Sequence, residues 1–298
     1  MDIRTRRSNR LIAPALAVLL LAGCVPSGFR TSKTMEQNAI HMSQTPVTVI
    51  SRNGSVQVIA DPTLADIQIS ARITCGGATQ AQADDRLADA SIDVSRDLSR
   101  RLTIKPVFPG GERNGDGASI TVRLPDACGI EVDTSNGAVV LRGLTGEAIV
   151  DTSNGSVTVE DHNGQATLET SNGRVTVTGH VGPLDVDTSN GSVKAHQIAG
   201  PVRIRTSNSS ITFSLAPDQP GPIRLDTSNG AIRATVGPAF VGRVRLDTSN
   251  ARLRIEDHSG RMKSQSVHRS RATVVVGEGG SVSNLDTSNG GITFIVEG

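Results

Sequence analysis

The pentapeptide Asp-Thr-Ser-Asn-Gly constrains this chain most, because it recurs almost unchanged at regular spacing through the second half of the sequence. Copies begin at Asp133, Asp151, Glu169, Asp187, Arg205, Asp226, Asp247 and Asp286. The steps are 18, 18, 18, 18, 21, 21 and 39 residues, and since 39 is 21 plus 18, a degenerate copy is expected at His268. A repeat of this period predicts stacked structural units rather than a ligand-binding word repeated for avidity.

The residues after each pentapeptide alternate between apolar and polar. Positions seven and nine of each unit are apolar throughout, and so is the residue before each new copy. Position seven holds Val139, Val157, Val175, Val193, Ile211, Ile232, Leu253, Val274 and Ile292. This period of two, broken by Gly and Asn, is typical of short, half-buried strands. A unit of about 20 residues cannot bury its own apolar face, so the sequence predicts an all-β fold, a parallel β-helix or β-solenoid of stacked coils.

Each pentapeptide is expected to form a corner of its coil. Glycine adopts a positive φ without steric cost and asparagine tolerates one, while the leading aspartate is expected to accept backbone hydrogen bonds as an Asx turn. Coils stacked about 4.8 Å apart would also align Asn and Thr side chains into hydrogen-bonded ladders. A shorter echo, SRNGSVQV at residues 51–58, has the same Asn-Gly and alternating valines.

The N-terminus carries a targeting pattern. Four arginines precede an apolar stretch that begins at Leu11 and ends in Leu-Ala-Gly-Cys at Cys24. The pattern predicts a signal peptide over residues 1–23, and its ending resembles the lipobox of bacterial lipoproteins. The resemblance implies cleavage before Cys24, lipidation of that cysteine and a membrane-tethered lipoprotein. Val25, in place of Asp, favours the outer membrane if the cell is Gram-negative.

The chain between the signal and the repeats has a different character. Residues 24–44 are polar and are predicted to be a tether. Residues 45–130 are predicted to be a β-rich cap, because a solenoid needs its open end covered. The cap is expected to contain one short helix at 78–90, anchored by Leu87, and a flexible loop at 109–117. The solenoid repeats are predicted to fill residues 131–298.

Together, the signal, the strands around NGSVQV, the Ala-rich helix, a strand ending in VRLP and the repeated Asn-Gly corners resemble a known group. They resemble the bacterial putative-adhesin family of β-strand-repeat proteins, a domain of unknown function found in cell envelopes. The resemblance covers most of residues 45–298. It implies a right-handed parallel β-helix outside the cytoplasm, and it carries no established catalytic residues over to this chain.

Composition argues against several functions. Removing residues 1–23 takes away four Arg and one Asp, so the formal net charge changes from +1 to −2. A nearly neutral chain lacks the basic surface expected of a nucleic-acid-binding protein. Trp and Tyr are absent and there are five Phe, which leaves few platforms for stacking bases or sugars. We therefore expect no nucleic-acid partner.

One column of histidines bears on the question of catalysis. His162, His180 and His258 share position twelve of their coils, where Leu144 and Ile198 stand in others. Two adjacent histidines do not supply the three or four ligands of a zinc site. The column is therefore interpreted as structural.

A column of acids could suggest calcium. Asp133, Asp151, Glu169 and Asp187 would stack four carboxylates. Calcium needs six to eight oxygens, however, and the nine-residue calcium-binding repeat is absent. The sequence therefore predicts no metal, no cofactor and no isolated carboxylate pair of the kind that hydrolyses glycosides.

Residues 201–275 hold a local charge excess, with twelve Lys or Arg against five Asp or Glu. Arg233 and Arg254 share position eight of neighbouring coils, and Arg224 and Arg245 share another outward column. These four arginines are the candidate anion-contact surface, for anionic envelope polymer or lipid head groups. A solvated basic face is the alternative.

Cys75 and Cys128 are the only thiols besides Cys24. An exported chain meets an oxidising compartment, where an even pair of cysteines commonly forms a disulfide. A bridge between the two is therefore expected, and two separate buried thiols, each packing as a small apolar side chain, are the alternative.

These observations predict a non-catalytic lipoprotein of the cell envelope that acts through surface contacts as an adhesin or scaffold. Two alternatives stay open. One is a β-helix enzyme acting on envelope or extracellular polysaccharide, and the other is an assembly or regulatory partner of another envelope protein.

Overall fold

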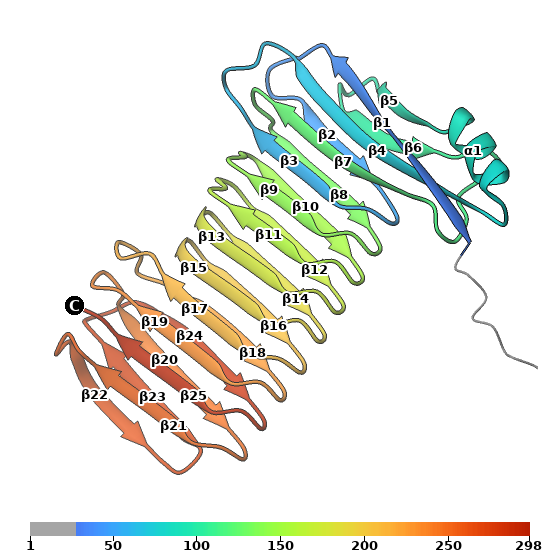
Figure 1. Cartoon of the computed structure of the whole chain (residues 1–298). Coiled ribbons are helices and arrows are strands. Elements are labelled where there is room, and N and C mark those ends of the chain that lie inside the picture. Colours follow the sequence, from blue (N-terminus) through green and yellow to red (C-terminus); the bar gives the residue numbers. More distant parts are fainter. Residues whose placement is uncertain (1–27) are drawn as a thin grey trace, which may run out of the picture.

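Two long β-sheets face each other across one apolar core (Figure 1). The computed structural model describes residues 28–298. Sheet A contains, in spatial order, β1 (Phe29–Ala39), β4 (Ile67–Gly77), β7 (Gly117–Leu124), β3 (Val56–Ala60), β9 (Val139–Arg142), β11 (Val157–Glu160), β13 (Val175–Val181), β15 (Val193–Ala199), β17 (Ile211–Leu215), β19 (Ile232–Val236), β25 (Ile292–Val296) and β21 (Leu253–Asp257). Sheet B contains β22 (Met262–Val267), β23 (Arg271–Val276), β20 (Gly242–Thr248), β24 (Ser281–Thr287), β18 (Ile223–Thr227), β16 (Val202–Thr206), β14 (Leu184–Thr188), β12 (Ala166–Thr170), β10 (Glu147–Thr152), β8 (Gly129–Thr134), β2 (Pro46–Ile50), β6 (Leu102–Val107) and β5 (Ser91–Arg96).

Each coil contributes one strand to each sheet, as the repeat predicts. Strands of successive coils pair in parallel, so that Val175 lies beside Val157 on one side and Val193 on the other. All three side chains are fully buried, because alternate residues of a strand point to the same face. Identical apolar positions therefore stack into one continuous core, and the predicted β-solenoid is confirmed.

The glycine that ends most corners is favoured by close packing between coils and not by its backbone conformation, and Ser209 and Ala251 take its place in two corners. Gly173 and its equivalents in the other corners are absent from the residues with positive φ. A Cβ at Gly173 would lie 1.7 Å from the carbonyl oxygen of Gly155 on the preceding coil. The explanation from positive φ is therefore wrong: at these glycines an added side chain would collide with the backbone of the neighbouring coil.

The threonine of the pentapeptide, rather than the aspartate, holds the corner. Thr170 Oγ1 accepts a hydrogen bond from the amide of Gly173 at 3.1 Å and donates one to the carbonyl of Gly155 at 3.3 Å. Thr287 makes the same two contacts, with the amide of Gly290 and the carbonyl of Gly230. These buried hydroxyls thereby satisfy corner amides and carbonyls that water cannot reach. The predicted Asx turn is wrong, because no leading aspartate of the described residues makes such a bond.

The predicted asparagine ladder is confirmed. Each amide nitrogen Nδ2 donates to the Oδ1 of the neighbouring coil at 2.6–2.8 Å. The ladder runs without interruption through Asn53, Asn136, Asn154, Asn172, Asn190, Asn208, Asn229, Asn289 and Asn250. Because it begins in the echo at 51–58, that echo is the first coil of the solenoid.

The cap is an insertion between the first coil and the second. β2 and β3 pair in parallel with β8 and β9 of the next coil. The chain between β3 and β8 forms β4 to β7 and the helix α1 (Gln80–Asp89). The helix predicted at 78–90 is confirmed, and Leu87 is buried. The predicted boundary of the cap, 45–130, is wrong at its start because β2 and β3 belong to the solenoid.

The tether predicted for residues 24–44 is wrong from Phe29 onward. β1 pairs antiparallel with β4 along its whole length, from Phe29 opposite Gly77 to Ala39 opposite Ile67. Met35 and Ala39 pack against the core, while the other face of the strand is exposed. An edge strand with one solvated face tolerates many polar residues, which is why its composition is that of a tether.

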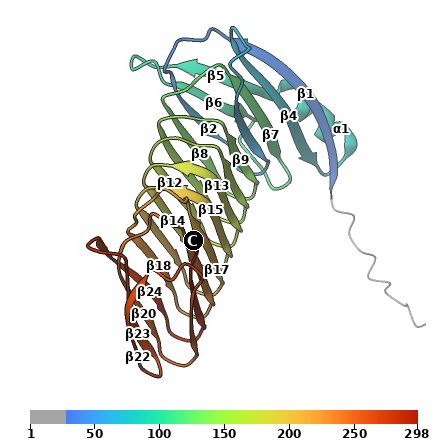
Figure 2. The same ribbon diagram turned by 90° about the vertical axis from the view of Figure 1, so that its left-hand side faces the viewer.

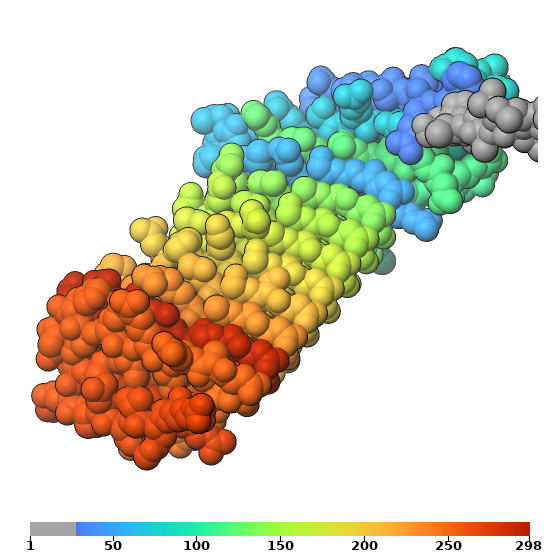
Figure 3. Space-filling view, turned by 60° about the horizontal axis from the view of Figure 1, so that its bottom comes forward, coloured from blue at the N-terminus to red at the C-terminus, as the bar shows by residue number. Residues whose placement is uncertain are grey.

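The C-terminal coil does not lie at the end of the stack. β24 lies between β18 and β20, and β25 lies between β19 and β21. In Figure 3 the red C-terminal residues form a band between orange neighbours. Residues 238–280 therefore form the most distal coil, β20 and β21, together with β22 and β23. The chain then returns, and its last coil, β24 and β25, lies between this distal coil and the coil of β18 and β19.

The prediction of a degenerate coil at His268 is wrong. Ala272, Val274 and Val276 are buried as the alternation predicts, but β23 runs antiparallel to both β20 and β22. β22 and β23 form a hairpin that extends sheet B alone, at the end opposite α1 (Figure 2). A period-two pattern does not reveal strand direction, so a hairpin strand was indistinguishable from a coil.

Candidate functional site

The four candidate arginines do not form one surface. Arg224 and Arg245 lie on sheet B, whereas Arg233 and Arg254 lie on sheet A. The inserted coil also separates each pair, placing Asn284 between the two on sheet B. The prediction that each pair occupies neighbouring coils is therefore wrong.

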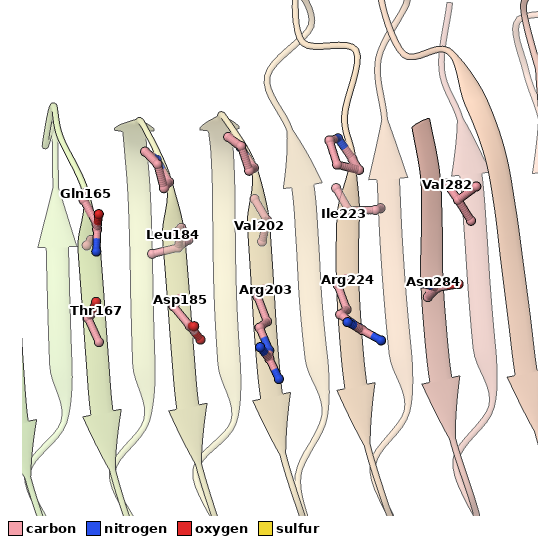
Figure 4. Close-up of a pocket in the computed structure, with 14 residues that line it drawn as sticks. Gln165, Thr167, Leu184, Asp185, Val202, Arg203, Ile223, Arg224, Val282 and Asn284 are labelled. Carbon is pink, nitrogen blue, oxygen red and sulfur yellow. The ribbon is translucent and has the colours of Figure 1, made fainter. Parts of the chain in front are cut away.

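Sheet B carries an elongated groove that we call the proline–arginine groove (Figure 4). Its volume is about 480 Å³. The lining comes from the successive strands β12, β14, β16, β18 and β24 and from the residues just before them. Figure 4 shows Thr167, Asp185, Arg203, Arg224 and Asn284 side by side on these strands. The groove therefore crosses the strands and follows the long axis of the solenoid.

One side of the groove is apolar. Pro183, Pro201 and Pro222 each stand one residue before the paired part of their strand, and Val282 occupies the same row on β24. Pro183 and Pro201 are exposed, and Val282 is 45% exposed. Proline is tolerated there because the first residue of a strand can do without a ladder amide. The result is an exposed apolar row along several coils.

The other side of the groove is charged, with Asp185 followed by Arg203 and Arg224 on successive strands. Arg203 and Arg224 lie opposite each other on adjacent strands, and Arg245 follows beyond Asn284. Arg224 contacts Asp226 at 3.7 Å. Within residues 28–298, Arg203 and Arg245 take part in no ion pair. A signal for this site is present in the sequence, because three Gly-Pro pairs end at Pro183, Pro201 and Pro222, which are 18 and 21 residues apart.

A second cluster, the aspartate column, borders the groove on the same sheet. Asp286 lies in register between Asp226 and Asp247. An arginine forms an ion pair at each end of this column: Arg205 pairs with Asp187 at 2.8 Å, and Arg271 pairs with Asp247 at 2.8 Å. The recess over this column has a volume of about 520 Å³.

The central carboxyl of the column titrates abnormally. Burial, followed by the charge of Asp226 and a hydrogen bond with it, raises the pKa of Asp286 to about 6. Asp247 adds to this shift. The cluster exists only because the C-terminal coil inserts between the coils that carry Asp226 and Asp247. The order of repeats along the chain therefore could not predict it.

The histidine column is buried in the second corner of the coils. The rings of His162 and His180 are stacked, with centroids 5.2 Å apart and Nδ1 atoms 3.2 Å apart. Burial, followed by the neighbouring His180, lowers the pKa of His162 to about 4. His258 lies apart from them and contacts Glu297 at 3.2 Å. The pair is inaccessible to a substrate, in agreement with its structural interpretation.

The predicted disulfide is wrong. Cys75 and Cys128 are free thiols, one buried within β4 of sheet A and the other exposed before β8 of sheet B. Cys128 Sγ lies 2.8 Å from the carbonyl of Gln44. The two cysteines belong to different sheets, which the spacing in the sequence could not reveal. Cys24 and the signal peptide lie outside the described residues.

Residues 28–298 contain neither a metal-binding cluster nor a membrane-spanning helix. No group of three or more His, Cys, Asp or Glu residues there is arranged to hold a metal ion. No helix in this part of the chain is long and apolar enough to cross a membrane.

Two-strand coils, stacked in register around one core and joined by an asparagine ladder, define a β-solenoid repeat protein. The chain belongs to the Toastrack DUF4097 family, which matches residues 53–294. The predicted membership of a β-strand-repeat family of unknown function is thus confirmed.

Three solved structures align with most of this chain. A putative cell adhesion protein from Clostridium sporogenes ATCC 15579 is 9% identical over 89% of this chain and 100% of its own, with a TM-score of 0.22. A putative adhesin from Bacteroides fragilis NCTC 9343 is 14% identical over 89% and 97%, with a TM-score of 0.31. A putative adhesin from Parabacteroides distasonis ATCC 8503 is 12% identical over 90% and 97%, with a TM-score of 0.43. Curated proteins give no match.

Proposed function

We propose that this protein is a non-catalytic, lipid-anchored arm of the cell envelope that acts through surface contacts as an adhesin or scaffold. The observation that carries the proposal is the uninterrupted stacking of twelve and thirteen strands. At about 4.8 Å per strand, the stack is roughly 50 to 60 Å long. Such a stack suits presentation of a surface at a distance from an anchor.

The position of β1, the first strand of the described residues, supports the same proposal. β1 lies at the capped end of sheet A, and its first residue follows Cys24 by five positions. A lipid on Cys24 would hold the cap near the membrane. The proline–arginine groove, on strands nearer the other end, would then lie away from the anchor (Figure 1).

The anchor is tested by changing Cys24 to Ala and comparing membrane and soluble fractions. We expect the wild-type chain in membranes, labelled by a fatty-acid analogue, and the variant in the soluble fraction without label. Cys128→Ala, which changes a cysteine that is exposed in the described part of the chain, is the matched control and should stay in membranes. Unchanged retention of the Cys24 variant would refute the anchor.

A second candidate, a hydrolase acting on polysaccharide, is favoured by one observation. Asp226 and Asp286 lie on adjacent strands, and the pKa of Asp286 is raised to about 6. Retaining glycosidases place two carboxyls about 5 Å apart and keep one of them protonated. Incubating the full chain with uronic-acid polysaccharide and measuring reducing ends separates the candidates. Release of ends that is lost in Asp286→Asn would establish the enzyme, and no release is expected here.

A further inference from the structure

We infer that the proline–arginine groove binds a linear polyanionic glycan that carries a carboxylate on successive sugars. The inference rests on the proposed function, for which it names the partner.

The shape of the groove fits a linear polymer. Its lining extends over five adjacent strands, so it is about 19 Å long at 4.8 Å per strand. It is open along one side of sheet B and crosses the strands (Figure 4). An extended chain can lie in it over several coils, whereas a compact ligand would use only a fraction of its length.

The two sides of the groove match the two surfaces of such a polymer. The row of Pro183, Pro201 and Val282 offers apolar area to the C–H faces of sugar rings without aromatic residues. The guanidinium groups of Arg203 and Arg224 stand one strand apart beside that row. Guanidinium binds carboxylate through paired, charge-assisted hydrogen bonds. Among the described residues Arg203 forms no ion pair, although Asp185 lies in register with it on the adjacent strand.

Other occupants fit less well. A peptide that adds a strand needs a free sheet edge, but the strands below the groove are each paired on both sides. A membrane requires exposed apolar groups that protrude into it, whereas the apolar row lines a recess of about 480 Å³. A glycan can bind through side-chain contacts alone along the long axis of the solenoid, and it needs no free sheet edge.

The test measures binding of a short oligogalacturonate to the full chain by calorimetry at low ionic strength. The groove variant is Arg203→Gln/Arg224→Gln, and the matched control is Arg233→Gln/Arg254→Gln, which removes the same charge from sheet A. We expect the groove variant to bind at least about tenfold more weakly, the loss typical of a charged hydrogen bond. The control should change by less than about threefold, since only long-range attraction is reduced.

A neutral oligosaccharide of the same length and phosphatidylglycerol vesicles complete the experiment. Neither should compete with oligogalacturonate for the groove. Equal weakening in both double variants, absence of binding by the wild-type chain, or competition by the vesicles would each overturn the inference. Thermal melts of both variants should match the wild type, since all four side chains are exposed. Binding of the chain to isolated envelopes without binding to oligogalacturonate would sink this inference and leave the proposed function standing.

Discussion

Arg86 of α1 and Asp116 of the loop before β7 form a buried, two-pronged ion pair, with Nη1–Oδ1 and Nη2–Oδ2 both at 2.7 Å. Burial alone would raise the pKa of Asp116, but hydrogen bonds from Arg86 and from two backbone amides outweigh it and hold that pKa below its usual value. Arg86 also donates to the carbonyls of Gly76 and Gly111. The pair therefore fastens the helix and the loop to the capped end of the core.

Removing one partner of this pair should destabilise the cap. We expect Asp116→Asn to lower the free energy of unfolding by about 3 kcal/mol or more, because a buried guanidinium loses its counter-charge. Asp85→Asn, on the exposed face of the same helix, should change stability by less than about 0.5 kcal/mol. Urea unfolding followed by circular dichroism measures both. Similar midpoints for the two variants would show that the pair does not stabilise the cap.

A methyl group at a corner glycine should be poorly tolerated. In Gly173→Ala the new Cβ would lie 1.7 Å from the carbonyl of Gly155, so the coils must separate and we expect a loss of about 3 kcal/mol or more. Gly129→Ala is the control, since its Cβ would meet nothing closer than 3.4 Å. Thermal melting compares them. A Gly173 variant as stable as the control would mean that stacked corners are looser than described.

Acid should weaken the fold through the histidine pair. The pKa of His162 is lowered to about 4, against about 6.5 in an unfolded chain. The folded state therefore binds fewer protons between these values, so its stabilisation is complete above pH 6.5 and is lost as the pH falls towards 4. The shift corresponds to about 3 kcal/mol.

The variant His162→Leu/His180→Ile tests this, because it copies Leu144 and Ile198 at the same position of the flanking coils. Urea unfolding near pH 7 and near pH 4.5 should show a smaller loss of stability for the variant than for the wild type. An unchanged difference between the two pH values would assign the acid sensitivity to other groups.

The aspartate column should have the opposite pH dependence. Because the pKa of Asp286 is raised from 3.8 to about 6, its stabilising effect is full below pH 4 and is lost as the pH rises through 6. Asp286→Asn keeps the polar side chain but removes the charge. We expect it to stabilise the protein near neutral pH by about 1 to 2 kcal/mol, since water screens a partly buried carboxylate.

Little effect is expected from Asp286→Asn below pH 4, where the wild-type carboxyl is already neutral. Asp151→Asn, an exposed member of the same column, is the control and should change stability by less than about 0.5 kcal/mol at either pH. Melting temperatures at the two pH values decide the matter. Destabilisation of the Asp286 variant near neutral pH would contradict repulsion within the column.

Some properties of this protein follow from the sequence alone, because they are local or strictly periodic. The alternation of valines with polar residues predicts strands, and the 18-residue period predicts which residues stack, so the core and the asparagine ladder from Asn136 to Asn229 could be derived without coordinates. The helix α1 followed from its alanine-rich composition. In each case the information lies within one repeat or between consecutive repeats.

Only the tertiary structure decided the order of the coils and the two surfaces built on it. Asp286 lies 60 residues from Asp226 in the chain yet on the adjacent strand. Nearly identical repeats fit beside one another in any order, so their pattern does not specify which coil neighbours which. Strand direction at β23, the pairing of β1 with β4 and the burial of Asp116 are likewise set by long-range contacts. The periodic pattern determines what each coil is, and long-range packing determines where it lies.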